Sequence, residues 1–166
     1  QTGQRLETPI IVFHSSEQEP WSPDKFNNAN QQLVAGLAKS LAKIGFRVFV
    51  FGKFDESIAG VHKGVQYMDS EFYQPFLSTY ITSILIVCND TSNLIYHANV
   101  KKAFFWVTEE LPYNSQAKKL LSIQYHPKKF KKIIAMGKDH KQQLANTLNI
   151  DSRNISITNY AYDETL

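Results

Sequence analysis

Short, continuous apolar runs alternate with polar stretches along the whole chain. The runs are Pro9–Phe13, Arg47–Phe51, Ser83–Cys88, Ala103–Val107 and Lys132–Met136, with a weaker one at Ile155–Ile157. They are rich in β-branched or aromatic residues, and their apolar residues are consecutive rather than alternating with polar ones. Such runs are typical of strands that are buried on both faces of a parallel sheet. We therefore predict a strand at each of them.

Segments with helical periodicity separate these runs. The clearest covers residues 28–44, where apolar residues line one stripe. Gly45 follows directly, at the position where a helix favours a left-handed C-cap. Further helices are predicted at 115–125 and 139–148, and weaker ones at 71–80 and 92–97. Between Gly52 and Met68 the pattern predicts a loop with one short extension, GVQY.

This alternation predicts an α/β fold: a Rossmann-like, doubly wound, mostly parallel sheet with helices on both faces. Residues 9–158 would form this domain, after a disordered tail or expression remnant at 1–8 and before an inter-domain linker that starts at 159–166. In such sheets, ligands bind beyond the carboxyl ends of the strands. The candidate site residues are those just after the predicted strands, namely 14–16, 52–53, 89–90, 108–110 and 137–138.

The composition is that of an ordinary globular domain, with 43% hydrophobic and 20% charged residues in 166. A chain of this length buries enough surface to fold without disulfides or metals. Its single cysteine, Cys88, lies in an apolar run, where a small buried hydrophobe is expected. No transmembrane run or signal-peptide core is evident. We expect a cytoplasmic location, with membrane association as an open alternative.

The net charge of +3 is distributed unevenly. Residues 1–90 carry 7 Lys and Arg against 9 Asp and Glu, whereas residues 91–166 carry 11 against 6. The basic stretch HPKKFKK, with Lys128, Lys129, Lys131 and Lys132, suits phosphate or an anionic membrane surface. It is too short and too poor in arginine to predict nucleic-acid binding. A solvated connection before a strand is the simpler explanation.

Several familiar motifs are missing from the sequence. No G-x-G-x-x-G follows the first strand, and there is no phosphate-binding P-loop, no G-x-S-x-G elbow and no histidine pair at metal-ligand spacing. The first loop instead carries Trp21 and the amide residues Asn28, Asn30 and Gln31. Neutral amides suit sugar hydroxyls, although simple helix capping would explain any one of them.

Two adjacent carboxylates, Glu109 and Glu110, follow the strand that ends at Val107. Neighbouring side chains in an extended turn point in different directions, so we expect only one to face a cleft. A carboxylate there could act as a base or hold a hydroxyl. The alternative is a solvated or helix-capping glutamate.

The order of short motifs resembles the N-terminal domain of GT-B-fold glycosyltransferases, specifically retaining family 4 (glycosyl transferases group 1). The matching segments span Pro9 to Asp163 and are Trp21-Ser22-Pro23, Asn28–Gln31, Gly45–Val50, Gly64–Tyr67, Thr108–Pro112, Gly137–Leu144 and Asn159–Asp163. The sequence departs from the family at three places. Asn28-Ala29 replaces the glycine pair, Thr108 replaces the sugar-contacting histidine, and Gly137 replaces a serine.

The resemblance implies the acceptor-binding half of an enzyme that moves a sugar from a nucleotide-sugar donor to a carbohydrate or glycosylated acceptor, with retention. Glu109 and Thr108 would be catalytic, and Trp21 would offer a ring face to a sugar. The implied substrate-binding residues are His14, Ser15, Trp21, Asn28, Asn30, Gln31, Asn89, Asp90, Glu110, Gly137 and His140. The domain itself would hold no metal or cofactor. The donor would bind to a C-terminal domain of the same polypeptide, so the 166-residue chain alone would be inactive.

Two other functions remain open from the sequence. The chain could be a stand-alone Rossmann-like module that binds a carbohydrate or a partner protein without catalysis. It could also be another doubly wound enzyme, such as a nucleotide-binding or flavodoxin-like protein. The missing phosphate loop argues against the latter.

Overall fold

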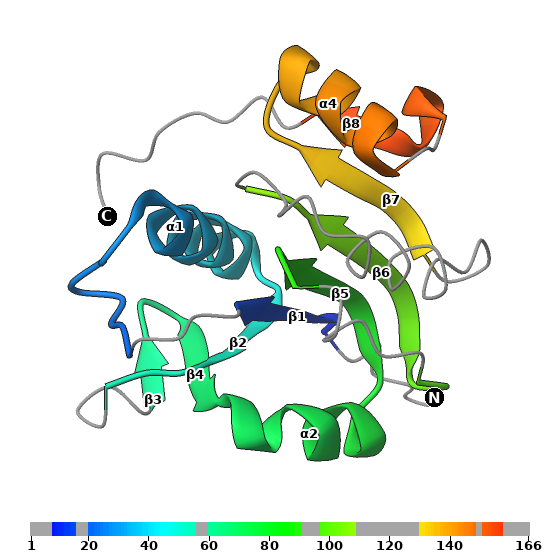
Figure 1. Cartoon of the computed structure of the whole chain (residues 1–166). Coiled ribbons are helices and arrows are strands. Elements are labelled where there is room, and N and C mark those ends of the chain that lie inside the picture. Colours follow the sequence, from blue (N-terminus) through cyan, green and yellow to red (C-terminus); the bar gives the residue numbers. More distant parts are fainter. Residues whose placement is uncertain are drawn as a thin grey trace.

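The computed structural model describes residues 8–15, 20–55, 60–90, 97–108, 130–148 and 151–157. An eight-stranded sheet with the order β3-β4-β2-β1-β5-β6-β7-β8 forms its centre (Figure 1). The strands are β1 Ile10–Ser15, β2 Arg47–Gly52, β3 Gly60–His62, β4 Val65–Asp69, β5 Thr82–Cys88, β6 Val100–Trp106, β7 Phe130–Ala135 and β8 Ile155–Ile157. Neighbouring strands pair in parallel, except for the antiparallel edge pair β3 and β4. The protein is therefore an α/β protein with a mostly parallel sheet, as predicted.

The strand order reverses direction beside β1. From β1 the chain moves outward to β2 and β4, then returns to the other side of β1 as β5 and continues through β6, β7 and β8. A sheet with this reversal has a topological switch point between its two central strands. Here that point lies at the carboxyl ends of β1 and β5, where Ser15 is paired with Cys88.

Two hydrophobic clusters cover the sheet, and adjacent residues of β1 belong to different clusters. Ile11 and Phe13 pack with residues of α1 (Ala29–Ile44), whereas Ile10 and Val12 pack with residues of α2 (Tyr73–Thr79) and α4 (Lys138–Leu148). This follows from strand geometry, because successive side chains point to opposite faces. In Figure 1, α1 lies above the strands and α2 lies below them.

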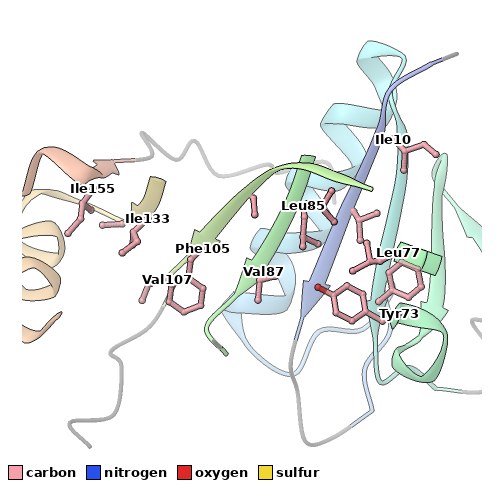
Figure 2. Packing of buried hydrophobic residues seen from close by; sticks show 14 of the residues in the cluster. Ile10, Tyr73, Leu77, Leu85, Val87, Phe105, Val107, Ile133 and Ile155 are labelled. Atoms are coloured by element: carbon pink, nitrogen blue, oxygen red, sulfur yellow. The ribbon is translucent and has the colours of Figure 1, made fainter. Parts of the chain in front are cut away.

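The cluster that contains α2 extends across the sheet to the C-terminal strands. Figure 2 shows Tyr73 and Leu77 of α2 beside the central strands, with Phe105 and Val107 farther along and Ile133 and Ile155 at the other end. Leu144 and Ala145 of α4 complete it. Two short 3-10 helices, Ser70–Phe72 and Ser152–Asn154, lead into α2 and β8.

Local signals fix both ends of α1. The side chain of Asn28 accepts a hydrogen bond from the backbone N–H of Gln31 and so caps the N-terminus. Gly45, at φ 115°, ends the helix in the left-handed region, where glycine has no Cβ penalty. Its backbone N–H donates to the carbonyl groups of Leu41 and Ala42.

Most predicted elements are confirmed to within a few residues. The loop prediction for 52–68 is wrong in part: its GVQY extension coincides with β4, which pairs in parallel with β2, but the pattern does not predict β3. The predicted helix at 115–125 lies outside the described residues, as does the one at 92–97 except for His97. Among the residues that the structure describes, no helix is long and apolar enough to cross a membrane.

Candidate functional site

Residues from three strands meet at the switch point, and we call them the switch-point edge: His14, Ser15, Asn89, Asp90 and Thr108. His14 and Ser15 end β1 and are buried, with 5% and 3% of their surface exposed. Asn89 and Asp90 follow β5, and Thr108 follows β6; all three are half-buried. The strand registers pair Ser15 with Cys88 and Cys88 with Trp106, which places these strand ends side by side.

Asn89 forms a tight turn directly after β5. Its φ of 62° is positive, which is uncommon for a residue other than glycine. Across it, the N–H of Asp90 donates to the carbonyl of Cys88 at 2.7 Å, which is the hydrogen bond of a three-residue γ-turn. A turn of this hand is strained, and such strain persists only where the surroundings enforce it. Here the turn is held by hydrogen bonds between Asn89 and residues at the end of β6.

The side chain of Asn89 makes two hydrogen bonds to Thr108. Its Nδ2 donates to Thr108 Oγ1 at 2.7 Å, and its Oδ1 accepts from the Thr108 backbone N–H at 2.8 Å. The backbone N–H of Asn89 also donates to the Trp106 carbonyl at 3.0 Å. Asn89 therefore acts as a positioning residue, which fixes Thr108 and directs Asp90 away from the strand.

His14 is an uncharged group at physiological pH. Burial lowers the pKa of its imidazole from 6.5 to about 4, and the Asp90 carboxylate offsets part of this effect by raising the pKa. The ring centroid lies 4.4 Å from that of Tyr73 in an edge-on arrangement. A neutral imidazole has one N–H donor and one nitrogen acceptor, which suits a hydroxyl group.

Two buried N–H groups lie near the carboxyl ends of β6 and β7. His140 Nδ1 accepts from the Met136 backbone N–H at 3.1 Å, so the proton of the neutral ring lies on Nε2. Neither His140 Nε2 nor Trp106 Nε1 has an acceptor among the described residues. An unsatisfied buried donor costs about 1–3 kcal/mol, so an added oxygen acceptor at either group would be stabilising.

Trp21 is part of the core rather than of an exposed surface. Only 1% of the residue is exposed, and its ring centroid lies 5.1 Å from Phe54 and 6.2 Å from both Phe26 and Tyr67. Its backbone N–H donates to the Lys53 carbonyl, which ties the first loop to the end of β2. The expected ring face for a sugar is therefore not available, because other aromatic rings cover it.

The amides at the start of α1 are largely used within the loop. Asn28 caps the helix, and Gln31 Oε1 accepts from the Asn27 backbone N–H at 2.7 Å. Gln31 is 1% exposed, so its side chain offers a substrate almost no accessible surface. Helix capping, the simpler explanation, accounts for Asn28 and Gln31. Asn30 is half-buried in the first turn of the helix.

The remaining candidates are distributed as follows. Gly137 and His140 lie just after β7 and in the first turn of α4. Glu109, Glu110, Lys128 and Lys129 lie outside the described residues, and for Lys131 and Lys132 the description covers only their place in β7. Within the described ranges, no group of histidine, cysteine or acidic side chains could hold a metal ion.

Replacing Asn89 tests its positioning role. We expect Asn89→Ala to lower the free energy of unfolding by about 2 kcal/mol, since it removes two hydrogen bonds and leaves a Cβ residue in the left-handed region. Asn89→Gly should cost less than Asn89→Ala, because glycine adopts positive φ without penalty. Urea unfolding of both variants measures the difference. Equal stability of wild type and Asn89→Ala would contradict the assigned hydrogen bonds.

The sequence pattern predicts neither the contact of Tyr73 with His14 nor the positive φ of Asn89. The turn had a local signal, since Asn-Asp directly after a buried strand favours a turn and Asn tolerates the left-handed region. Tyr73 had none, because it comes from a helix distant in sequence that the sheet places over His14.

The switch-point edge thus combines a neutral imidazole, an amide that holds a threonine, and one carboxylate. These groups can donate and accept hydrogen bonds to a polar ligand. Comparison with models of known protein families gives no match for this chain, and neither does comparison with curated protein sequences.

Proposed function

We propose that the chain is the N-terminal, acceptor-binding half of a GT-B-fold glycosyltransferase, doubly wound with helices on both faces. The enzyme would move a sugar from a nucleotide-sugar donor to an acceptor with retention. The observation that supports this most directly is the switch-point edge, where Asn89 fixes the backbone and hydroxyl of Thr108 beside the carboxyl ends of β1 and β5. Open α/β sheets bind their ligands at this place.

Each group has a role in this proposal. Thr108 occupies the position of the sugar-contacting histidine in the resembled family, and its hydroxyl is held by Asn89. Glu109 is the next residue and would hold or deprotonate an acceptor hydroxyl. The neutral ring of His14 adds a further hydrogen-bonding group that does not change charge near neutral pH. The donor and its phosphates would be bound by a second domain of the same polypeptide.

Transfer assays on the complete gene product test this function. With a panel of nucleotide-sugar donors, we expect transfer or donor hydrolysis, and we expect Glu109→Gln to lower the rate by about 100-fold. Glu71→Gln is the matched control, since Glu71 is exposed beside α2 and should leave the rate unchanged. Undiminished transfer in Glu109→Gln would overturn the site, and failure to bind or turn over any donor would overturn the function.

A non-catalytic carbohydrate-binding module is the second candidate. The start of α1 favours it, because Asn28 replaces a glycine of the pair that admits donor phosphates in the resembled enzymes, and its side chain is used to cap the helix. Saturable binding of a sugar by the complete gene product, without donor binding or turnover, would favour this candidate over the transferase.

A further inference from the structure

We propose that the edge of the sheet opposite the switch-point edge is a docking surface for an anionic lipid bilayer. Exposed cations and exposed apolar side chains gather there, where β2, β5 and β6 begin. We call this surface the amino edge, and its residues are Lys43, Ile44, Arg47, Tyr80, Ile81, Lys101 and Lys102. None of them belongs to the switch-point edge, so this surface does not depend on the proposed transferase activity.

The strand register brings these positions to one edge of the sheet. Arg47 pairs with Ile10 where β2 and β1 begin, and Thr82 pairs with Val100 where β5 and β6 begin. Helix α1 ends just before β2, and α2 ends just before β5. Because β2, β1, β5 and β6 are consecutive in the sheet, the starts of these strands and the ends of the two helices lie along the same edge.

Asn99 ties the end of α2 to the start of β6. Its Nδ2 donates to the carbonyl groups of Leu77 at 3.1 Å and Ser78 at 3.0 Å. Its own carbonyl accepts from the backbone N–H of Thr82 at 2.9 Å. These hydrogen bonds hold Ile81 beside the first residues of β6, so the apolar and basic groups here form one connected surface.

The apolar side chains of the amino edge are unusually accessible. Ile44 is 73% exposed and Ile81 is 60% exposed, although isoleucine is among the residues most often buried. Tyr80 is 49% exposed, and its ring centroid lies 4.8 Å from that of Phe76. Apolar groups beside cations suit the boundary between lipid headgroups and acyl chains, where an amphipathic tyrosine ring is also favoured. The two isoleucines are therefore placed to enter that boundary.

The charges of the amino edge have a single sign. The three stretches of chain that form it contain no Asp or Glu: residues 25–54, 72–89 and 91–108. Lys43 lies in the last turn of α1, where a cation also complements the helix dipole. Arg47, Lys101 and Lys102 lie in strands instead, so no helix end accounts for them. Four exposed cations thus remain to attract an anionic surface.

The described carboxylates do not cancel this charge. Five of them follow strands or begin helices at the opposite edge: Asp55, Asp69, Glu71, Asp90 and Asp139. Asp24 contacts His62 at 2.9 Å, and Asp151 contacts Arg153 at 2.6 Å. The chain segments before β1 and β7 add more cations than carboxylates: Arg5, Lys128 and Lys129 against Glu7.

A bilayer fits this combination better than a nucleic acid does. A basic cluster attracts either polyanion, but exposed aliphatic side chains gain burial only in lipid. Arg47 is the one arginine among the four cations, whereas nucleic-acid sites favour arginine. With a bilayer at the amino edge, the switch-point edge would face the solvent, because parallel strands end on the side opposite to their starts.

Co-sedimentation of the 166-residue chain with lipid vesicles tests the surface. We expect binding to vesicles of phosphatidylserine mixed with phosphatidylcholine, and much weaker binding to phosphatidylcholine alone. High salt should release the protein, since it screens exposed charges. Lys101→Gln combined with Lys102→Gln should weaken binding by about 10- to 30-fold, because each cation near an anionic surface contributes about 5-fold.

Ile44→Ser combined with Ile81→Ser tests insertion. It should weaken binding by about 10-fold, because less apolar area enters the lipid, and it should leave the salt dependence in place. The charge control is Lys25→Gln combined with Lys53→Gln, which removes two exposed cations from the loop before α1 and from the end of β2. The apolar control is Val61→Ser, at a position that is 71% exposed in the outermost strand. Both controls should bind like the wild type.

Circular dichroism of each variant checks that the fold is intact. Weaker binding of both amino-edge variants, with unchanged binding of both controls, would support the inference. No binding to the mixed vesicles at low salt, equal binding by all variants, or binding to a DNA duplex in preference to the vesicles would overturn it. None of these outcomes changes the sugar-transfer assay, so the two proposals fail or hold separately.

Discussion

Trp21→Ala is expected to lower the free energy of unfolding by about 4 kcal/mol, because it deletes a large aromatic side chain from a closed core. Trp21 is 1% exposed and contacts the rings of Phe26, Phe54 and Tyr67. The surrounding rings come from the first loop, the segment after β2, and β4, and they cannot all collapse into the space that is left. Urea or guanidinium unfolding followed by circular dichroism measures the loss.

A conservative variant distinguishes packing from ligand contact at this position. Trp21→Phe keeps much of the ring and should cost about 1–2 kcal/mol, within the range of volume-reducing core substitutions. Binding of a neutral sugar by the folded protein should be unchanged in Trp21→Phe. A variant that loses sugar binding while keeping wild-type stability would show instead that the indole contacts the ligand, as the sequence suggested.

The second large effect is a loss of stability in mild acid that originates at His14. Burial lowers the pKa of this imidazole from 6.5 to about 4, with the Asp90 carboxylate opposing the shift. Between these two values the unfolded chain binds a proton that the folded protein does not, so the free energy of unfolding falls as the pH falls. The pKa shift of His14 changes the free energy of unfolding by about 3 kcal/mol. This stability is fully present above pH 6.5 and is lost by about pH 4.

The variant His14→Phe isolates this contribution, because phenylalanine keeps a planar ring beside Tyr73 and does not titrate. We expect the wild type to lose stability between pH 6.5 and pH 4.5 more steeply than the variant, whatever the variant's absolute stability. Denaturant unfolding at a series of pH values measures both slopes. Parallel pH profiles for the two proteins would show that His14 does not carry the buried, neutral charge state assigned to it.

The sequence by itself determined the class of the fold and the places where chemistry could occur. Continuous apolar runs such as Ser83–Cys88 predict strands covered on both faces, and the amphipathic segment ending at Gly45 predicts α1, because both patterns follow from the period of the backbone. The rule that ligands bind after parallel strands then selects His14, Asn89, Asp90 and Thr108 as candidates.

The tertiary structure decided which of the candidate side chains remain available. The sequence places Trp21 and Gln31 in and just after a polar loop, where side chains that face a ligand are expected. In the structure both residues are buried, because the loop is tied to the end of β2 and to the start of α1. Burial depends on segments that are distant along the chain, and a local pattern does not contain them. The same holds for β4, whose short run Val65–Asp69 becomes a strand by pairing with β2 on one side and β3 on the other.

The finest features of the switch-point edge were also decided by long-range contacts. Nothing local to Asn89 specifies that its amide meets Thr108, nineteen residues later, since that pairing depends on the register between β5 and β6. The neutral state of His14 likewise depends on burial, to which Tyr73 of α2 contributes, and Asp90 at the end of β5 only partly opposes that lowering of the pKa. Residue types set the chemistry that was available, and sheet order set which groups came together, because hydrogen bonding and desolvation act over ångströms rather than over sequence separation.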